Sequence, residues 1–279
     1  MTSPAISIIV PCFKQAEYLP EALDSLIAQT FENWEAVVVN DGSPDHTEEI
    51  ALAYAAKDPR IKYLPLENGG VARARNRGIA IAQGEYILPL DADDTIAPTY
   101  LEKAKAALDN NPTLKAVYCQ AQLFGSQKGP WGVKYHDYKT LLVVNSIFVT
   151  TLFRKADAEA IGGFDEKMIS GHEDWDFFIR LLGGDGHVYQ IPETLFNYRI
   201  KNLSRNTEAV KRLSDTQYYL LDKNRALYQQ FYPLPFNGIG GAEIMAAEAE
   251  ALRSEVVKYR ERRRNRWYKR LYRALLGKQ

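Results

Sequence analysis

Residues 6–43 read ISIIVPCFKQAEYLPEALDSLIAQTFENWEAVVVNDGS, and this stretch decides the fold. Two apolar runs, Ile6–Val10 and Ala36–Asn40, are rich in β-branched residues and short enough to be buried strands. Between them, Tyr18–Gln29 carries apolar side chains on one helical stripe. A strand, a helix and a second strand in this order predict a parallel pair of strands with a crossover helix.

The same alternation continues through the first half of the chain. Further strands are expected at Ile61–Leu64 and Tyr86–Leu90, and further helices at Thr47–Ala56 and Val71–Ala82. The pattern predicts an α/β fold with a Rossmann-like, mostly parallel sheet flanked by helices. Ligands bind at the carboxyl ends of the strands in such sheets, so the polar residues that follow each strand are site candidates.

The second half of the chain has a less regular pattern, and its sheet pairing is left open. A strand is expected at Lys115–Gln122 and a helix at Trp175–Leu182. A break rich in proline and glycine at 232–238 predicts two domains, one at 1–235 and a C-terminal helical extension at 236–279.

Composition excludes several classes of protein. The 279 residues are 46% hydrophobic, enough for a sizeable core, and 35 basic residues balance 35 acidic ones, which argues against a generally basic nucleic-acid binder. Cys12 and Cys119 lie far apart in apolar surroundings, so neither a disulfide framework nor a metal–cysteine motif is expected. No stretch has the length and character of a membrane span or a signal peptide, so a cytoplasmic location is predicted.

The C-terminal tail concentrates positive charge. Ten of the residues at 258–279 are Lys or Arg, and apolar residues recur at four-residue spacing from 262 to 276. This basic amphipathic pattern is typical of a helix on an anionic membrane surface, which predicts a peripheral protein on the inner face of the cell membrane. A coiled-coil or partner-docking helix, compatible with a homo-oligomer, is the second interpretation. Nucleic-acid binding is the weakest, and no nucleic-acid partner is expected.

Three carboxylates follow directly on an apolar strand in the sequence LPLDADD at 88–94. Carboxylates packed this closely repel one another, and a divalent cation with oxygen ligands, Mn²⁺ or Mg²⁺, is the usual remedy. The alternative is a turn in which Asp93 or Asp94 caps the helix that follows Pro98.

A second turn, VVVNDGS at 37–43, exposes Asp41 at the end of a buried strand. Its carboxylate could accept hydrogen bonds from a base imide or a ribose hydroxyl, although Asp-Gly-Ser is also a common plain turn. After the first strand, residues 11–15 read PCFKQ and lack Gly-x-Gly-x-x-Gly, which argues against a dinucleotide dehydrogenase.

Two further clusters place charged residues at predicted helix starts. The glycines at 69–70 lead into a helix with three arginines, of which Arg75 is the preferred contact for a phosphate or a uracil-like ring and Arg73 the second. Glu173 and Asp174 begin another helix, where a base could deprotonate a hydroxyl group. The alternative for these acids is simple stabilisation by the helix dipole.

Together, these clusters resemble those of the family 2 inverting glycosyltransferases of the GT-A fold, across about residues 6–204. Six stretches carry the resemblance in matching order: SIIVP at 7–11, VNDGS at 39–43, ARNRG at 74–78, LDADD at 90–94, GGFD at 162–165 and EDW at 173–175. The resemblance implies a nucleotide-sugar donor, most often UDP-linked, and a divalent metal. It also implies a nucleotide-binding half at 1–115 and an acceptor and catalytic half at 116–206.

The resemblance implies roles for single residues as well. Asp174, beside Glu173, would be the general base, and Asp93 the metal ligand. The nucleotide-binding residues would be Pro11, Phe13, Asp41, Arg75, Asp91, Ala92 and Lys201.

Two departures from the family pattern bear on the kind of enzyme. The late Tyr-Arg-x-His element reads YRIK at 198–201, and Lys201 suits a phosphate better than a metal ion. The Gln-x-x-Arg-Trp element of processive synthases is missing. We therefore expect a non-processive glycosyltransferase of hexosyltransferase type in polysaccharide biosynthesis, acting on a glycan or lipid-linked acceptor. A sugar nucleotidyltransferase and a non-catalytic sugar-nucleotide or membrane-binding module are the alternatives.

Overall fold

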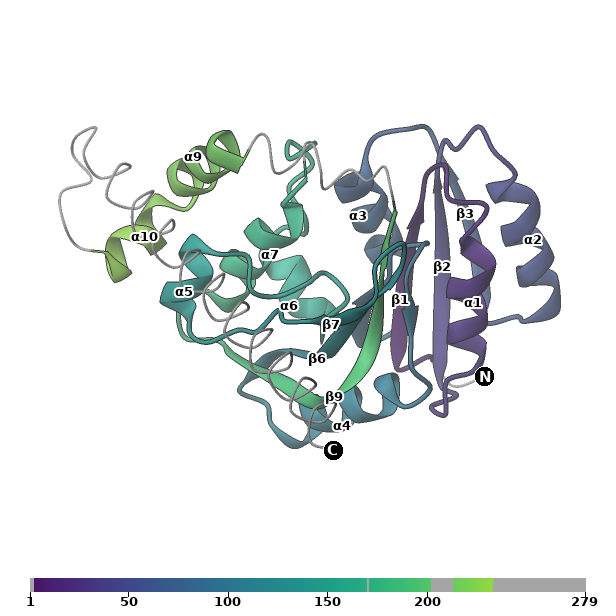
Figure 1. Ribbon diagram of the computed structural model, residues 1–279, viewed down its shortest axis with the longest axis horizontal. Coiled ribbons are helices and arrows are strands. Elements are labelled where there is room, and N and C mark those ends of the chain that lie inside the picture. Colours follow the sequence, from purple (N-terminus) through teal and green to yellow (C-terminus); the bar gives the residue numbers. More distant parts are fainter. Residues whose placement is uncertain (1–2, 170, 202–212, 233–279) are drawn as a thin grey trace, which may run out of the picture. The chain divides into compact units, whose positions relative to one another are not determined.

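The computed structural model describes residues 3–169, 171–201 and 213–232 (Figure 1). In chain order its elements are β1 (Ile6–Cys12), α1 (Leu19–Ile27), β2 (Trp34–Asp41), α2 (Thr47–Lys57), β3 (Ile61–Leu66), α3 (Val71–Ile81), β4 (Tyr86–Pro89), β5 (Thr95–Ile96), α4 (Tyr100–Asn110), β6 (Leu114–Gly125), β7 (Gly129–Trp131), α5 (Tyr138–Val143), β8 (Leu152–Arg154), α6 (Lys155–Ala160), α7 (Glu173–Leu182), β9 (His187–Ile200), α9 (Leu213–Lys223) and α10 (Arg225–Phe231).

The strands of the described residues form one sheet in the order β3-β2-β1-β4-β8-β6-β9-β5, and β7 pairs with β6. The first four strands are parallel, with Ile6 of β1 opposite Trp34 of β2 and Tyr86 of β4. β8 runs antiparallel to β4 and β6, β6 and β9 are parallel, and the short β5 is antiparallel to β9. The predicted α/β fold with flanking helices is confirmed, and its second half adds antiparallel strands to the parallel ones.

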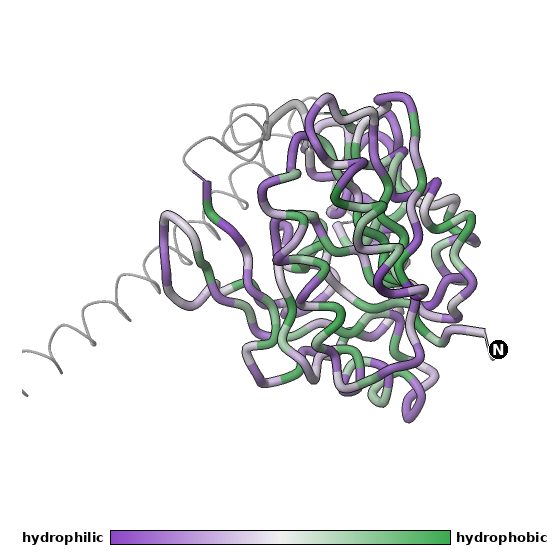
Figure 2. Tube along the Cα trace, turned by 90° about the vertical axis from the view of Figure 1, so that its right-hand side faces the viewer, coloured by the Kyte–Doolittle hydropathy of each residue, from purple (hydrophilic) through white to green (hydrophobic). Residues whose placement is uncertain are grey.

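Helices pack on both faces of the sheet because side chains alternate along β1. Ile8 and Val10 join a buried cluster with Leu23 of α1 on one face. On the other face α3 approaches so closely that a Cβ atom at Gly78 would lie 2.4 Å from Ile9 Cγ2. Figure 2 shows hydrophobic segments gathered in the interior and hydrophilic segments on many outer turns. The close approach of α3 keeps its first turns at the carboxyl ends of β1 and β2.

Most predicted elements are present, with ends that differ by a few residues. The expected strand at 115–122 is part of the longer β6, and the expected helix at 175–182 begins two residues earlier, at Glu173. The apolar stretch at 141–153 divides between the end of α5 and most of β8. β9 is the main addition, because its sequence contains a proline and scattered polar residues that mask its strand character.

Internal contacts divide the chain into two units, 1–227 and 228–279. The second unit lies almost wholly outside the described residues, so the boundary at 235 and the tail helix stay predictions. Among the described helices, none combines the length and apolar character that crossing a membrane requires. Cys12 and Cys119 are both buried and free.

Candidate active site

The carboxyl ends of β1, β2 and β4 lie at one edge of the sheet, because these strands are parallel neighbours. β1 leads into residues 13–15, β2 ends at Asp41, and β4 leads into the segment that we call the acidic loop, residues 91–94. The three polar clusters predicted from the sequence therefore meet at one edge, where an α/β sheet ordinarily binds its ligand.

Arg75 of α3 is the central cation of the site. Its side chain is 1% exposed, with Nη1 2.6 Å from Glu173 Oε1 and Nη2 2.6 Å from Asp91 Oδ1. Burial disfavours the charged guanidinium, but the carboxylates of Asp91 and Glu173 outweigh that effect and raise the pKa of Arg75. Arg75 thus connects the acidic loop to the start of α7.

Asp174 lies half-buried in the first turn of α7. The backbone N–H of Trp175 donates to Asp174 Oδ1 at 2.8 Å, and the side-chain amide of Asn145 donates to the same oxygen at 3.2 Å. Burial, and then the negative charge of Glu173, raise the pKa of Asp174 to about 7, against the opposing charge of Arg75. A carboxyl group with this pKa can exchange a proton at neutral pH, as a general base requires.

Each carboxylate of the acidic loop has its own partner. Asp91 is 31% exposed and contacts Arg75 as described. Asp93 Oδ2 lies 2.5 Å from Lys201 Nζ. Asp94 is buried and accepts the backbone N–H of Arg199 at 2.7 Å, and its burial together with the charges of its two neighbours raises its pKa well above the ordinary value. The loop is therefore held by α3 on one side and by the end of β9 on the other.

Asp41 is buried at the end of β2 and faces the loop that opens α3. Its two carboxylate oxygens accept the backbone N–H groups of Gly69 and Gly70 at 2.8 and 2.9 Å. The side-chain amide of Asn68 donates to it at 3.2 Å. Asp41 thus fixes the start of α3 at the sheet edge, and its contact with a nucleotide base stays a prediction.

Three other predicted nucleotide contacts lie along the same edge. Pro11 is buried within β1, and Ala92 is buried within the acidic loop. Phe13 follows β1 and is 40% exposed, so its ring is open to a ligand. Arg73 donates to the carbonyl oxygen of Glu67 at 3.1 Å, on an exposed part of α3.

A cavity of about 300 Å³ opens between the acidic loop and the start of α7. Its polar lining includes Arg75, Asp91, Asp94, Asn145, Glu173 and Asp174. The structure therefore brings the predicted base, its neighbour Glu173, Arg75 and Asp91 into one site. Asp41, Phe13 and the Asp93–Lys201 pair lie outside the lining of this cavity.

Aromatic side chains form one side of the cavity, which we call the aromatic wall: Trp131, Phe148, Phe196 and Tyr198. Trp131 stacks on Tyr198 with 4.4 Å between ring centroids and on Phe148 with 5.7 Å. Such rings offer an apolar surface to the C–H face of a sugar or to a lipid chain. Tyr138 is not part of this wall but lies in the core, where its hydroxyl donates to the carbonyl oxygen of Ile179 at 2.9 Å.

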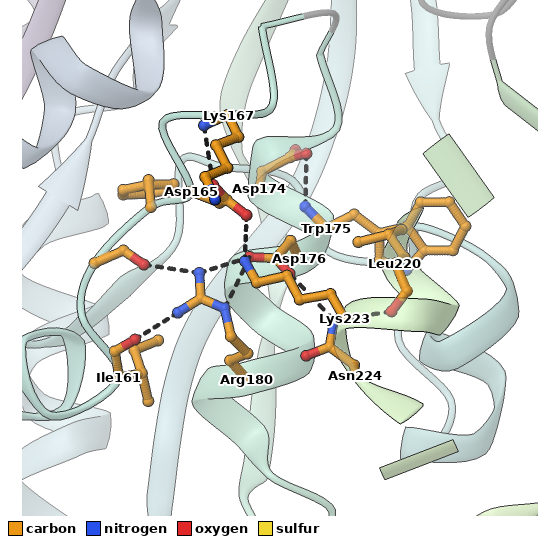
Figure 3. Close-up of polar contacts among 12 residues, drawn as sticks. Ile161, Asp165, Lys167, Asp174, Trp175, Asp176, Arg180, Leu220, Lys223 and Asn224 are labelled. Carbon is orange, nitrogen blue, oxygen red and sulfur yellow. Dashed lines mark hydrogen bonds and ion pairs between the residues drawn. The ribbon is translucent and has the colours of Figure 1, made fainter. Parts of the chain in front are cut away.

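A buried ion network anchors α7 beyond Asp174 (Figure 3). Asp176, two residues beyond Asp174, is fully buried and accepts from Arg180 Nε at 2.8 Å and from Lys223 Nζ at 2.9 Å. Lys223 of α9 also contacts Asp165 at 2.5 Å. The network ties α7 both to α9 and to the turn before it, which restricts movement of the predicted base.

The divalent ion implied by the resemblance can be tested against the side chains present. Within the described residues, no group of three or more His, Cys, Asp and Glu side chains is arranged to hold an ion. Asp93 already contacts the ammonium group of Lys201, and Asp91 contacts the guanidinium group of Arg75. A divalent ion prefers several oxygen ligands without competing cations, so the side chains as arranged do not fit one.

Sequence reasoning misses two residues that hold the site together. Asn145 positions Asp174, and the available signal is that Asn145 and Ser146 interrupt an otherwise apolar stretch. Arg199 holds the acidic loop, because its Nε donates to the carbonyl oxygen of Asp93 at 2.8 Å in addition to its backbone contact with Asp94. The signal for Arg199 in the sequence is its place in the YRIK element, two residues before Lys201.

A sheet of this kind, with acidic side chains at its carboxyl edge and a carboxylate opposite them, is the arrangement that the resemblance to GT-A glycosyltransferases leads us to expect. The family described as Glycosyl transferase family 2 matches residues 7–166, and the chain belongs to this family. An uncharacterized glycosyltransferase of Rickettsia typhi is 34% identical over 227 residues, which cover 76% of this chain and 69% of that protein. The chain is therefore a glycosyltransferase, and the nucleotidyltransferase and binding-module alternatives are set aside.

Two solved structures share the fold. Staphylococcus aureus TarS 1–349 in complex with UDP-GlcNAc superposes with a TM-score of 0.64 at 20% identity, covering 81% of this chain and 73% of that one. The mannosyltransferase PcManGT from Pyrobaculum calidifontis, in complex with GDP-Man and Mn²⁺, has a TM-score of 0.62 at 21% identity. The match covers 91% of this chain and 76% of that one. At these identities the likeness concerns the fold alone, and the predicted GT-A fold is confirmed.

Proposed function

We propose that the protein is an inverting, non-processive glycosyltransferase that moves a sugar from a nucleotide-sugar donor, a UDP-sugar, to a hydroxyl group of a glycan or lipid-linked acceptor. The observation that carries the proposal is Asp174, a carboxyl group with a pKa of about 7 that lines the same cavity as Asp91. The UDP-GlcNAc and GDP-Man bound to the similar structures support a nucleotide sugar as the class of donor.

The donor would lie along the carboxyl edge of the sheet. The exposed ring of Phe13 and the loop fixed by Asp41 would border the nucleoside, and Asp91 would accept a hydrogen bond from a ribose or sugar hydroxyl. Arg75 is buried against Asp91, so we assign it the task of orienting that carboxylate toward the donor. Lys201 would face the diphosphate.

Transfer would be a single displacement at the anomeric carbon. The two hydrogen bonds described for Asp174 both end on Oδ1, which leaves Oδ2 to accept the proton of the attacking hydroxyl. As the new carbon–oxygen bond forms, the bond to the diphosphate oxygen breaks on the opposite face, and its electrons stay on the diphosphate. One displacement of this kind inverts the anomeric configuration. The aromatic wall would hold the acceptor beside Asp174.

The function is tested by calorimetric titration of the full chain with UDP, GDP and TDP, with ADP as the control ligand. We expect one of the first three, UDP by this proposal, to bind at least about tenfold more tightly than ADP, a difference of about 1.4 kcal/mol. Nucleotide sugars that carry the nucleotide found to bind can then be assayed for transfer. The anomeric configuration of the product shows directly whether transfer inverts it. Equal or absent binding of all four nucleotides would contradict the proposal.

We also propose that the basic tail associates with an anionic membrane surface, on the strength of its sequence, since residues 258–279 lie outside the described part of the chain. Removing these residues should weaken sedimentation with phosphatidylglycerol vesicles and leave nucleotide affinity unchanged, because each basic residue near such a surface contributes about 1 kcal/mol. Vesicles of neutral lipid serve as the control. Equal binding of the full and shortened chains to anionic vesicles would exclude the membrane role.

A further inference from the structure

Lys201 occupies the position beside Asp93 where the resemblance would put a metal ion. Its ammonium nitrogen lies 2.5 Å from Asp93 Oδ2, 2.9 Å from Gln15 Oε1 and 5.2 Å from the centroid of the Tyr18 ring. These groups come from the acidic loop, from the segment after β1 and from the start of α1. The lysine is therefore enclosed by oxygen atoms and by an aromatic face, which are the surroundings that a cation requires.

The remaining carboxylates of the acidic loop are also compensated from within the chain. Asp91 contacts the guanidinium group of Arg75, and Asp94 accepts the backbone N–H of Arg199. A divalent ion at Asp93 would have to displace Lys201 and then stand beside its positive charge. Repulsion between the two cations would oppose that arrangement.

Lys201 is also accessible to a ligand. Its side chain is 20% exposed and that of Asp93 is 18% exposed, so the pair is neither sealed in the core nor free in solvent. An ammonium group has three N–H donors, and the described contacts with Asp93 and Gln15 use two of them. The third can donate to a phosphate oxygen of a donor bound along the sheet edge.

We propose that Lys201 replaces the divalent ion, so that this protein binds its nucleotide and transfers the sugar without a metal. The proposal rests on the proposed function and deepens it. When the bond between the anomeric carbon and the diphosphate breaks, the electron pair remains on the diphosphate, and Lys201 stabilises that charge as a hydrogen-bond donor without giving up its proton. The proton of the acceptor goes to Asp174.

Calorimetric titration of the full chain with UDP and with GDP, in EDTA and in Mn²⁺, tests the proposal. We expect the wild type to bind one nucleotide with a Kd that differs by less than about threefold between the two conditions, because Lys201 already pairs with the carboxylate of Asp93. In EDTA, Lys201→Ala should bind about 10- to 100-fold more weakly, the effect of losing one charged hydrogen bond, and Lys201→Arg should recover part of that loss. Lys103→Ala, which removes an exposed ion pair between Lys103 of α4 and Glu193 of β9, is the matched control.

Adding Mn²⁺ to Lys201→Ala supplies a further readout, because the variant uncovers Asp93 for an ion. Recovery of nucleotide affinity in that variant, together with no metal effect in the wild type, is the result that the proposal requires. Wild-type binding that appears only with Mn²⁺, or Lys201→Ala binding equal to wild type in EDTA, would overturn the proposal while leaving the glycosyltransferase function intact. Absence of binding by either nucleotide under both conditions would overturn the proposed donor site, and this inference with it.

Discussion

Replacing Asp174 with asparagine is expected to lower kcat by about 10²- to 10⁴-fold, the usual contribution of a general base. Asparagine keeps the size of the side chain and an oxygen that can accept the N–H of Trp175, but it cannot take a proton from the acceptor. Donor affinity should stay close to that of the wild type, because the lost interaction is made in the transition state. Steady-state kinetics and nucleotide calorimetry on the same preparation separate the two effects.

The pH dependence gives a second signature of the same group. The pKa of Asp174 is raised to about 7, so the wild-type rate should rise as the pH increases toward 7, where the carboxylate form becomes populated, and level off above it. The residual activity of Asp174→Asn should lack that rise. Glu173→Gln removes the negative charge that helps to raise the pKa of Asp174 and should move the rise to lower pH.

Stability distinguishes a catalytic defect from a folding defect. Folding raises the pKa of the Asp174 carboxyl group, so its contribution to stability is complete at a pH below its ordinary pKa. That contribution is lost as the pH rises through the pKa of the folded state, about 7. At pH 8 the buried charge is a cost, so Asp174→Asn should unfold at the same temperature as the wild type or higher. Asp222→Asn, at an exposed ion pair with Arg225, controls for charge removal alone. A kcat within about threefold of wild type, with an unchanged pH profile, would remove Asp174 from the role of base.

The parallel half of the sheet could be predicted because its information is local. β1 and β2 are buried at every position, and each contains a run of apolar, β-branched residues, so length and composition suffice to mark them as central strands. Parallel neighbours end at the same edge, and this rule alone brings the predicted Asp41 and acidic loop together. The resemblance of short motifs then assigns Glu173 and Asp174 to the same site. These two acids are the first residues of α7.

The second half could not be predicted because its order depends on pairing between distant segments. β9 lies beside β6 with register shifts around Cys119 and Gln120, and its burial does not alternate regularly. The sequence favours Arg75 among the arginines of α3 but does not show its surroundings. Arg75 is buried, whereas Arg77 is exposed, because of the face each occupies. The partners of Arg75 lie 16 and 98 residues away, beyond the reach of any local pattern.

Arg75→Met should lower the free energy of unfolding by about 3–5 kcal/mol, the cost of breaking a buried ion pair from one side. The substitution removes the guanidinium partner of the buried Glu173 carboxylate, whereas Asp91 is partly exposed and can be hydrated. Arg75→Lys should recover only part of the loss, because one ammonium group cannot copy two guanidinium contacts that point to different carboxylates. Urea denaturation followed by tryptophan fluorescence measures the differences.

The double variant Arg75→Met/Glu173→Gln separates two causes of the lower free energy of unfolding: the buried charge of Glu173 without its guanidinium partner, and the lost packing of the Arg75 side chain. With glutamine at 173, the buried side chain no longer carries a negative charge that has lost its guanidinium partner, so the double variant should be more stable than Arg75→Met alone. Its kcat should nevertheless stay low, because Asp91 and the start of α7 are no longer held together, and a displacement of about 1 Å can cost about 10²-fold in rate. An Arg75→Met variant within about 1 kcal/mol of wild type would mean that the guanidinium is not what joins the donor side of the site to the base.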